Sequence, residues 1–370
     1  MALDEIVADG FTDKLGGLYT ALSGMPADPE ALAGALSQLH GEVFAASRMS
    51  VVNAQRGFVG RLPGASDRFS VRQGIYRGVA PCAPCRSFSP VRSNQLNSWA
   101  AFTGDWLERK NVGDASGYDL RSAGVVVGMD RNVTRNMFGG FAVGYDNAYQ
   151  SFKTIRSNNQ IDAFRTALYG GWRSRDVYVD GYLGYTKNWN KTRRDINVGN
   201  FNGVARSKFD DDMLSTGFEL GRELRLGSTR LMPSVGLHYI RLASPTVTEG
   251  GAGAADLSVH SGRYSSLRMP VGAKVSRSLL GGGIIWTPEA RAFYVREFAD
   301  ASVRTGTSFA SVAGTPFFAE SGNWGRNSGR LGAGLNAQMT DWLNFRVDYD
   351  YEVFDYTSAS WFGTSLGVRW

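Results

Sequence analysis

The sequence has few of the residues that build metal or redox sites. It contains two cysteines and three histidines in 370 residues. Cys82 and Cys85 form a single Cys-x-x-Cys motif, whereas a zinc site would need a second pair or histidines at ligand spacing. A redox motif of this kind is expected near a βαβ pattern, which the sequence lacks. We therefore predict no metal and no cofactor, and we favour a short-loop disulfide between Cys82 and Cys85 in an oxidising compartment.

Long apolar runs are also missing. No stretch approaches 18 uncharged apolar residues, so the sequence offers no transmembrane helix. Asp4, Glu5 and Asp9 lie where a signal peptide needs apolar residues, and any export signal is expected upstream of Met1. Forty basic residues are offset by 34 acidic ones without a basic run, and we expect no nucleic-acid partner.

Aromatic residues make up 12% of the chain, there are 46 glycines, and apolar residues alternate with polar ones from Asn97 onward. The clearest alternation spans 343–353. Its apolar face comprises Leu343, Phe345, Val347, Tyr349, Tyr351 and Val353. Its polar face comprises Asn344, Arg346, Asp348, Asp350 and Glu352. A period of two predicts a strand that is apolar on one side only.

Twelve such strands are predicted after residue 97, and their connections differ in length. The predicted strands are 98–110, 118–130, 136–152, 160–173, 177–193, 206–226, 229–244, 264–279, 284–299, 327–339, 342–355 and 359–370. The even-numbered connections are five residues or shorter, while the first five odd-numbered ones, including 194–205, are longer. Short turns on one side and long loops on the other are typical of outer-membrane barrels. We therefore predict an all-β fold, a 12-stranded antiparallel up-and-down transmembrane barrel.

The region before the strands has helical character. Asp28 can cap a helix and Pro29 suits its first position. Leu32, Leu36, Leu39 and Val43 then fall on one helical face. We expect one helix from there to about Leu62, where Pro63 and Gly64 end it, followed by an arginine-rich linker to residue 97.

The end of the chain carries an aromatic terminal strand. Phe362, Leu366, Val368 and Trp370 share one face of it. Because every backbone group in lipid needs a partner, this strand must pair with the first strand to close the barrel. The pattern resembles the C-terminal signal of outer-membrane proteins, which implies recognition by the barrel-assembly machinery.

A broader resemblance covers about residues 17–370. The segment 31–43 resembles the one that autotransporters carry before their barrel. The segments 99–106, 124–130 and 137–145 resemble their first three strands, and 331–351 with 365–370 resemble their last strands. His40 departs from the family, which usually has a small residue there. The resemblance implies that 1–30 ends a passenger or linker, 31–97 is a pre-barrel helix and basic linker, and 98–370 is the translocator.

The barrel is expected to have room for one helix. Twelve strands about 4.8 Å apart and tilted by about 40° give a backbone diameter of roughly 24 Å and about 14 Å of free width. A helix is about 10–12 Å wide. We predict that part of 31–97 fills the lumen, with arginines facing inward-pointing acids. The predicted lumen-facing charged residues are Glu219, Glu223, Glu289, Arg346, Asp348, Asp350 and Glu352. Alternatively, these acids pair with neighbouring cations of the wall.

The resemblance implies an outer-membrane translocator that exports its own passenger. We expect as partners outer-membrane lipid, the barrel-assembly machinery, periplasmic chaperones and the passenger in cis, and we expect a monomer. A passive porin-like channel is the alternative, and a soluble β-sandwich conflicts with the loop asymmetry. We predict no enzyme, although self-cleavage at an asparagine such as Asn53, Asn94 or Asn97 stays open.

Overall fold

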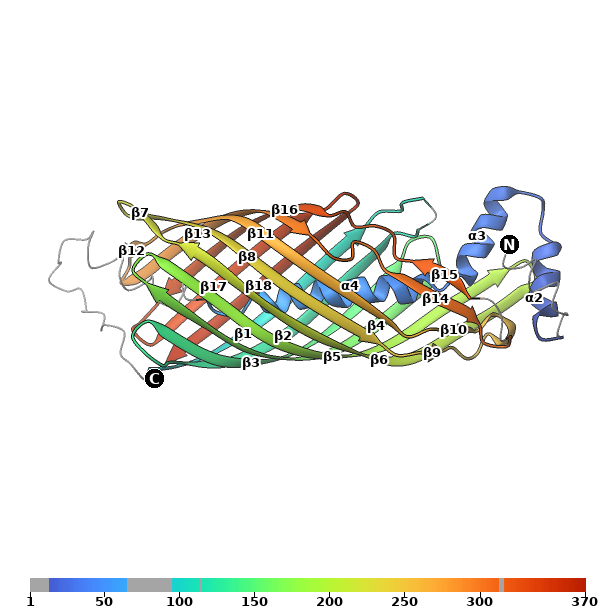
Figure 1. Cartoon of the computed structure of the whole chain (residues 1–370), viewed down its shortest axis with the longest axis horizontal. Helices are drawn as coiled ribbons and strands as arrows, with labels where there is room; N and C mark the ends of the chain where they lie inside the picture. The colour runs from blue at the N-terminus through green and yellow to red at the C-terminus, as the bar shows by residue number, and fades with distance from the viewer. Residues whose placement is uncertain (1–12, 65–94, 114, 313–315) are drawn as a thin grey trace.

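Twelve antiparallel strands close into one barrel in the computed structural model, which describes residues 13–64, 95–113, 115–312 and 316–370 (Figure 1). The wall strands are β1 (Leu96–Arg109), β2 (Tyr118–Asn132), β3 (Met137–Phe152), β4 (Ser157–Ser174), β5 (Val177–Val198), β6 (Phe201–Arg222), β8 (Thr229–Ser244), β11 (Gly262–Arg277), β13 (Ile284–Glu297), β16 (Asn327–Gln338), β17 (Leu343–Val353) and β18 (Thr357–Arg369). Each wall strand pairs with the next in sequence, and β18 pairs with β1, placing Ser98 opposite Val368. The predicted closure is confirmed.

The two ends of the barrel differ. One end, here the short-turn end, carries tight turns, the start of β1 and the C-terminus, with the small strands β7 (Leu224–Leu226) and β12 (Leu279–Gly281) in two turns. At the opposite, long-loop end, β9 (Val247–Thr248), β10 (Leu257–Val259), β14 (Arg304–Phe309) and β15 (Phe317–Glu320) form a separate four-stranded sheet, and the one-turn helix η1 (Gly253–Ala255) lies between β9 and β10. The predicted sorting of short and long connections is therefore present only in part, because the long-loop end also has three short connections: 153–156 after β3, 199–200 after β5 and 354–356 after β17.

The connection between β5 and β6 departs furthest from the prediction. We predicted a loop over 194–205, but both strands continue and meet at a two-residue turn, Gly199–Asn200. Gly199 has a φ of 55°, in the left-handed region that a tight turn requires. The extension exists because Ile196 and Val198 are buried against the N-terminal helices, a tertiary contact that the local sequence does not reveal.

Three helices precede the barrel: α2 (Asp13–Ser23), α3 (Pro29–Leu39) and α4 (Glu42–Val59). The predicted cap of α3 is confirmed, since Asp28 Oδ1 accepts a hydrogen bond from the backbone N–H of Glu30. The expectation of one continuous helix to Leu62 is wrong, because His40 is extended, with φ −100° and ψ 100°. Within the described part of the chain, no helix combines the length and apolar character needed to span a bilayer.

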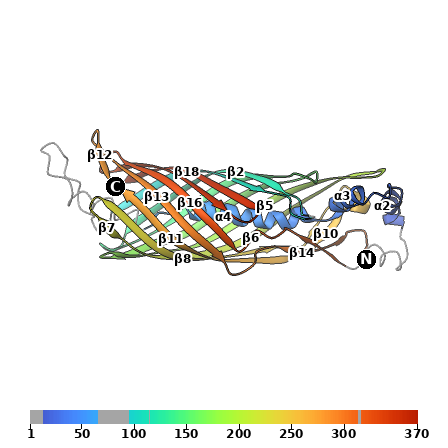
Figure 2. The same ribbon diagram turned by 90° about the horizontal axis from the view of Figure 1, so that it is seen from above.

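The break at His40 separates two packing environments. The segment before it, α2 and α3, packs outside the barrel on the β5–β6 extension, while α4 enters the barrel (Figures 1 and 2). Leu39 is buried in the first contact and Val43 in the second. Leu32 and Leu36, predicted on the same apolar face, are both about two-fifths exposed. One straight helix could not serve both surfaces.

The wall is apolar outside and polar inside, the reverse of a soluble domain. Exposed side chains on its outer face include Phe102, Val127, Phe141, Leu168, Leu183, Phe218, Tyr294, Leu331 and Phe362. Buried side chains on its inner face include Arg165, Thr186, Asn188, Asn190, Asp211 and Ser215. An apolar outer surface around a polar interior is the arrangement that a barrel needs in lipid.

A glycine in β2 allows an aromatic ring to fold across the inner wall. Gly128 lies opposite Trp99 of β1, and a Cβ at Gly128 would stand 2.4 Å from the indole. The indole N–H of Trp99 donates to the Tyr169 hydroxyl at 2.7 Å, which fixes the ring in place. The indole of Trp99 therefore has little freedom to move away from a Cβ added at Gly128.

We predict that Gly128→Ala destabilises the barrel by about 1–3 kcal/mol, the usual cost of overpacking. The measurement is the temperature at which the folded, fast-migrating band on an unboiled SDS gel is lost. Gly329→Ala in β16 is the matched control, because nothing lies within 4 Å of its Cβ position. Equal melting of the two variants would contradict the argument.

Candidate functional site

The lumen contains a helix of the same chain. From Glu42 to Phe58 every residue of α4 is buried except Arg56, which is partly exposed. The helix contacts β1 to β5 and β8 of the wall, and both ribbon views place it along the barrel axis. The interface between α4 and the wall is therefore the central structural feature of the lumen.

A polar hydrogen-bond network holds the upper part of α4. The Ser47 hydroxyl donates to Asn190 Oδ1 at 3.1 Å and accepts from Asn159 Nδ2 at 2.7 Å. Asn190 in turn donates to Asp211 at 2.9 Å. These groups are buried, so each bond made also avoids the cost of an unpaired polar atom.

A second network surrounds Gln55. Its amide nitrogen donates to Ser215 Oγ at 2.8 Å, and its amide oxygen accepts from Arg165 at 2.6 Å and from Thr186 at 2.8 Å. Arg165 is itself held by Asp146 through two hydrogen bonds. One glutamine thus links the helix to β4, β5 and β6, which fixes its height and rotation in the lumen.

The two ends of α4 are packed differently. At the long-loop end, Glu42 accepts a hydrogen bond from the backbone N–H of Ser116 at 3.1 Å. Val43 and Phe44 pack there against Leu257 and Val259 of the small external sheet. At the short-turn end, Phe58 lies in an apolar cluster of the inner wall that also contains Trp99, Val126, Phe138 and Tyr169. The external sheet therefore covers the N-terminal end of α4, and the apolar cluster of the inner wall holds its C-terminal end.

The arginines of α4 mostly contact neutral groups, contrary to the charge pairing that we expected. Arg48 donates to the hydroxyls of Ser244 at 3.1 Å and Thr305 at 2.8 Å. Arg56 donates to Ser266 at 3.3 Å and lies 3.9 Å from Glu297. In the described chain, the acids of the inner wall pair chiefly with cations of the wall itself.

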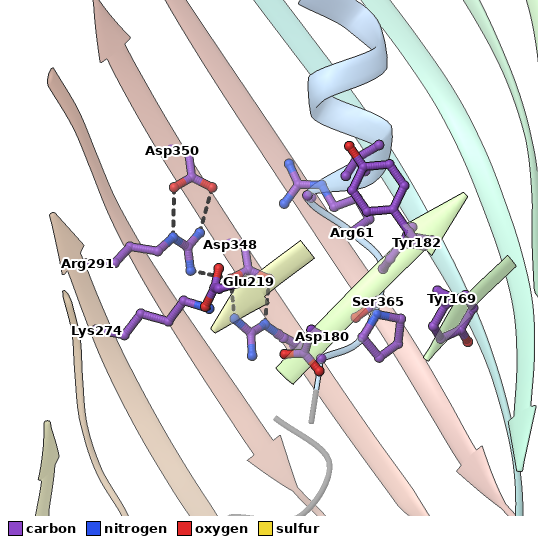
Figure 3. Close-up of a pocket in the computed structure, with 18 of the residues that line it drawn as sticks. Arg61, Tyr169, Asp180, Tyr182, Glu219, Lys274, Arg291, Asp348, Asp350 and Ser365 are labelled. Carbon is purple, nitrogen blue, oxygen red and sulfur yellow. Dashed lines mark hydrogen bonds and ion pairs between the residues drawn. The ribbon is translucent and has the colours of Figure 1, made fainter. Parts of the chain in front are cut away.

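Below α4, toward the short-turn end, lies a polar cavity of about 360 Å³ (Figure 3). Arg291 lines it and binds Asp350 with two hydrogen bonds of 2.7 Å, Glu289 at 2.9 Å and Asp348 at 3.1 Å. Lys274 lies 3.3 Å from Glu219 on the same wall. Figure 3 shows Arg61, from the end of the helical segment, beside this network. The wall of the cavity is highly charged on the side that faces away from the apolar cluster around Phe58.

The structure brings five of the predicted lumen-facing residues together. The residues lining the cavity are Glu219, Glu289, Arg346, Asp348 and Asp350. Glu223 lies instead just after β6, bound to Arg173 at 2.6 Å and Arg225 at 2.8 Å. Glu352 is buried higher in the wall, bonded to Arg268 and Ser328.

The remaining predicted residues are dispersed. Phe362, Leu366, Val368 and Trp370 follow the outer face of β18 at every second or fourth position, and Trp370 is three-quarters exposed. The predicted Cys82–Cys85 disulfide and Asn94 lie outside the described residues. Asn53 is fully buried in α4, with neither amide atom hydrogen-bonded, and Asn97 donates to Asp130 at 3.3 Å.

Sequence reasoning missed the residues that hold α4. Gln55, Asn159, Asn190 and Arg165 were not singled out, although the last three lie in or near predicted strands with inward polar positions. Their alternation with apolar residues indicates an inward direction. It does not indicate the partner, because the helix and the wall are more than 100 residues apart in sequence.

Comparison with known proteins gives a consistent result. The sequence model of a family described as "Autotransporter beta-domain" matches residues 98–350. Outer membrane protein B of Rickettsia typhi is 24% identical over 264 residues, which is 68% of this chain but 16% of that protein. The chain thus spans about a sixth of such relatives. An extracellular serine protease of Serratia marcescens is 23% identical over 175 residues, 46% of this chain and 16% of that protein.

Solved structures agree on the fold. The translocator domain of the autotransporter NalP from Neisseria meningitidis superposes with a TM-score of 0.63 at 16% identity, covering 89% of this chain and 99% of that one. The transport unit of AIDA-I from Escherichia coli gives a TM-score of 0.52 at 13% identity, covering 83% of this chain and 97% of that one. Both likenesses concern the architecture.

We predict that Gln55→Ala loosens α4 by about 1–3 kcal/mol, because Arg165, Thr186 and Ser215 lose a buried partner. The measurement is hydrogen–deuterium exchange of the peptides covering 42–59, which should become faster. Asn53→Ala is the matched control, since it removes a buried amide that has no hydrogen-bond partner. It should leave exchange unchanged or slower. If both variants exchange like the parent chain, the Gln55 network does not hold the helix.

Proposed function

Because the chain belongs to the autotransporter family through its β-domain, we propose that it exports its own N-terminal passenger across the membrane in which it lies. Proteins with this domain are barrels of the Gram-negative outer membrane, and this barrel lies there too. Its function is therefore that of an outer-membrane translocator with a passenger in cis. The translocator family is non-enzymatic, and self-cleavage of the chain is not part of the proposal.

The observation that carries the export proposal is the path of the chain through its own barrel. The external helices α2 and α3 lie beyond the long-loop end, and α4 follows inside the lumen. Gly64 then reaches the level of Asp180, near the short-turn end where β1 begins. Long loops of such barrels face the exterior and short turns face the periplasm. In this proposal the passenger, which precedes α2, therefore lies on the cell surface.

The width of the lumen limits how a passenger crosses. The barrel holds one helix in close contact over 17 residues, from Glu42 to Phe58. A folded domain is far wider than one helix. A passenger must therefore cross largely unfolded, or through a barrel that is widened during assembly. In this proposal α4 is the last segment to enter and stays behind as a plug.

Further partners follow from the terminal strand. We propose that Phe362, Leu366, Val368 and Trp370 form the signal that the barrel-assembly machinery binds. Periplasmic chaperones would bind the unfolded chain before insertion. The polar contacts between α4 and the wall fill the lumen without a second subunit, which supports a monomer.

Protease accessibility in intact cells tests the direction of export. An epitope placed before Asp13 should be removed by external protease, because the proposal puts this end outside. An epitope in the turn after Ser174, on the short-turn side, should survive until the outer membrane is permeabilised. Protection of the first epitope in intact cells would contradict export, while digestion of both would indicate a leaky membrane and require a repeat with an intact-cell marker.

The cavity beside Arg291 favours a passive channel as a second candidate function. The two functions differ in the role of α4, which blocks conduction in a plugged translocator. Deletion of residues 1–94 should raise single-channel conductance in planar bilayers severalfold. The fast-migrating band on an unboiled SDS gel confirms that the shortened barrel is folded. Equal conductance of the full-length and the shortened barrel would contradict the role of α4 as a plug and would favour the channel function.

A further inference from the structure

Four basic residues form two directly opposed pairs on the outward face of the β5–β6 hairpin. Lys191 of β5 lies opposite Lys208 of β6, and Arg193 lies opposite Arg206. All four side chains are exposed. The alternate residues Thr192 and Arg194 are buried on the inner side of the same strand, so the basic residues point away from the lumen and from α3.

Such pairing is unfavourable for the isolated hairpin. Residues directly opposite in antiparallel strands have their Cβ atoms about 4.5–5.5 Å apart, and like charges at that separation destabilise the pair. Lys191 lies 3.4 Å from Asp162, and Arg193 lies 2.9 Å from Asp195. Within the described residues, the side chains of Lys208 and Arg206 have no hydrogen bond or ion pair. The other two acids of this face, Asp210 and Asp212 of β6, lie 3.7 and 3.2 Å from Lys187 of β5. Each acid of the face thus already pairs with another cation, and Lys208 and Arg206 are left without one in the described part of the chain.

The position of these residues relative to the membrane points to the missing counter-charge. Below them the outward face of the hairpin first carries the ion pairs of Lys187 with Asp210 and Asp212, and it is apolar beyond these, with Leu183, Tyr185, Leu214 and Phe218 about half exposed. Trp189 follows at the upper edge, where aromatic side chains of a barrel mark the membrane interface. With a rise of about 3.3 Å per residue and a tilt near 40°, Lys191 stands roughly 5 Å and Arg193 roughly 10 Å above Trp189.

We propose that Lys191, Arg193, Arg206 and Lys208 bind the phosphate groups of a phosphorylated glycolipid in the outer leaflet. Phosphate is a doubly charged acceptor of several hydrogen bonds, and lysine and arginine are its usual ligands in proteins. One phosphate between two facing cations converts their repulsion into attraction. The height above Trp189 suits a headgroup whose acyl chains reach down to Leu183 and Phe218. This inference requires the outer-membrane location but not passenger export.

Lipid binding in detergent tests the assignment. The full chain is refolded in nonionic micelles and titrated with bisphosphorylated lipid A, and bound lipid is counted by native mass spectrometry. Lys208→Gln combined with Arg206→Gln should weaken binding about tenfold or more, the effect of losing charged hydrogen bonds. Arg131→Gln with Arg222→Gln removes two exposed charges near the short-turn end and should leave binding unchanged.

The melting temperature without lipid guards against misfolding. Because the double substitution removes like-charge repulsion, the Lys208→Gln, Arg206→Gln variant should melt at or above the parent chain in lipid-free micelles. Adding lipid A should then stabilise the parent and the short-turn control, but not this variant. A reversal of the stability order on adding lipid is a result that a merely structural role for the two residues would not give.

Two further ligands separate the sources of phosphate. Dephosphorylated lipid A should bind the parent and the variant equally weakly, and inorganic phosphate at millimolar concentration should not stabilise either. Equal binding of bisphosphorylated lipid A by parent and variant would overturn the proposal. So would tight binding of the dephosphorylated lipid, or stabilisation by inorganic phosphate that depends on Lys208 and Arg206, which would assign the site to a free anion.

Discussion

The pairing of β18 with β1 is the constraint on which the rest of the structure depends. In hydrocarbon, an unpaired backbone N–H or C=O costs several kcal/mol, so a sheet that spans lipid must have no free edge. Thirteen residue pairs, from Asn97–Arg369 to Arg109–Thr357, join the two strands and remove both edges. Closing twelve strands also fixes the width of the lumen, since diameter follows from strand number and tilt. That width accepts one helix, and α4 occupies it.

The contacts between α4 and the wall suit a segment that has to move through the lumen before it settles. Ser47 and Gln55 meet hydroxyls, amides and the guanidinium of Arg165, and the strong charges of the wall are paired within it, Arg165 with Asp146 and Arg291 with Asp348 and Asp350. A lumen with unpaired acids would hold every passing cation, because charges attract strongly where water is scarce. A polar surface whose charges are already paired offers the moving segment many weak contacts along the lumen. The final position is specified by Gln55 and by the external sheet over Val43 and Phe44, which form once passage ends.

Much of this architecture could be predicted from the sequence, because a strand in lipid must alternate at every second residue. The alternation over 343–353 located β17 to within a residue at its start, and all twelve wall strands were predicted near their observed bounds. The β5–β6 extension could not be predicted, because Ile196 and Val198 are buried by distant segments, α2, α3 and the η1 loop. The break at His40 has the same origin, since it reflects two packing surfaces rather than a local signal. For the site, alternation gave the direction of Glu289, Asp348 and Asp350. It did not reveal that Arg291 pairs with them, nor that polar side chains of β4, β5 and β6 hold the helix.

The central claim is that α4 lies inside the barrel of the exported protein, and a crosslink in the membrane tests it most directly. In a chain with Cys82 and Cys85 changed to serine, Ser47→Cys and Asn159→Cys place two thiols at positions whose side chains are 2.7 Å apart. Mild oxidation of isolated outer membranes should join residues 47 and 159 through a disulfide, detected as one linked peptide pair by mass spectrometry. The pair Ser37→Cys and Asn159→Cys, with its first residue on the exposed helix α3, should stay unlinked. Absence of the 47–159 link, with both thiols labelled after unfolding, would contradict the account.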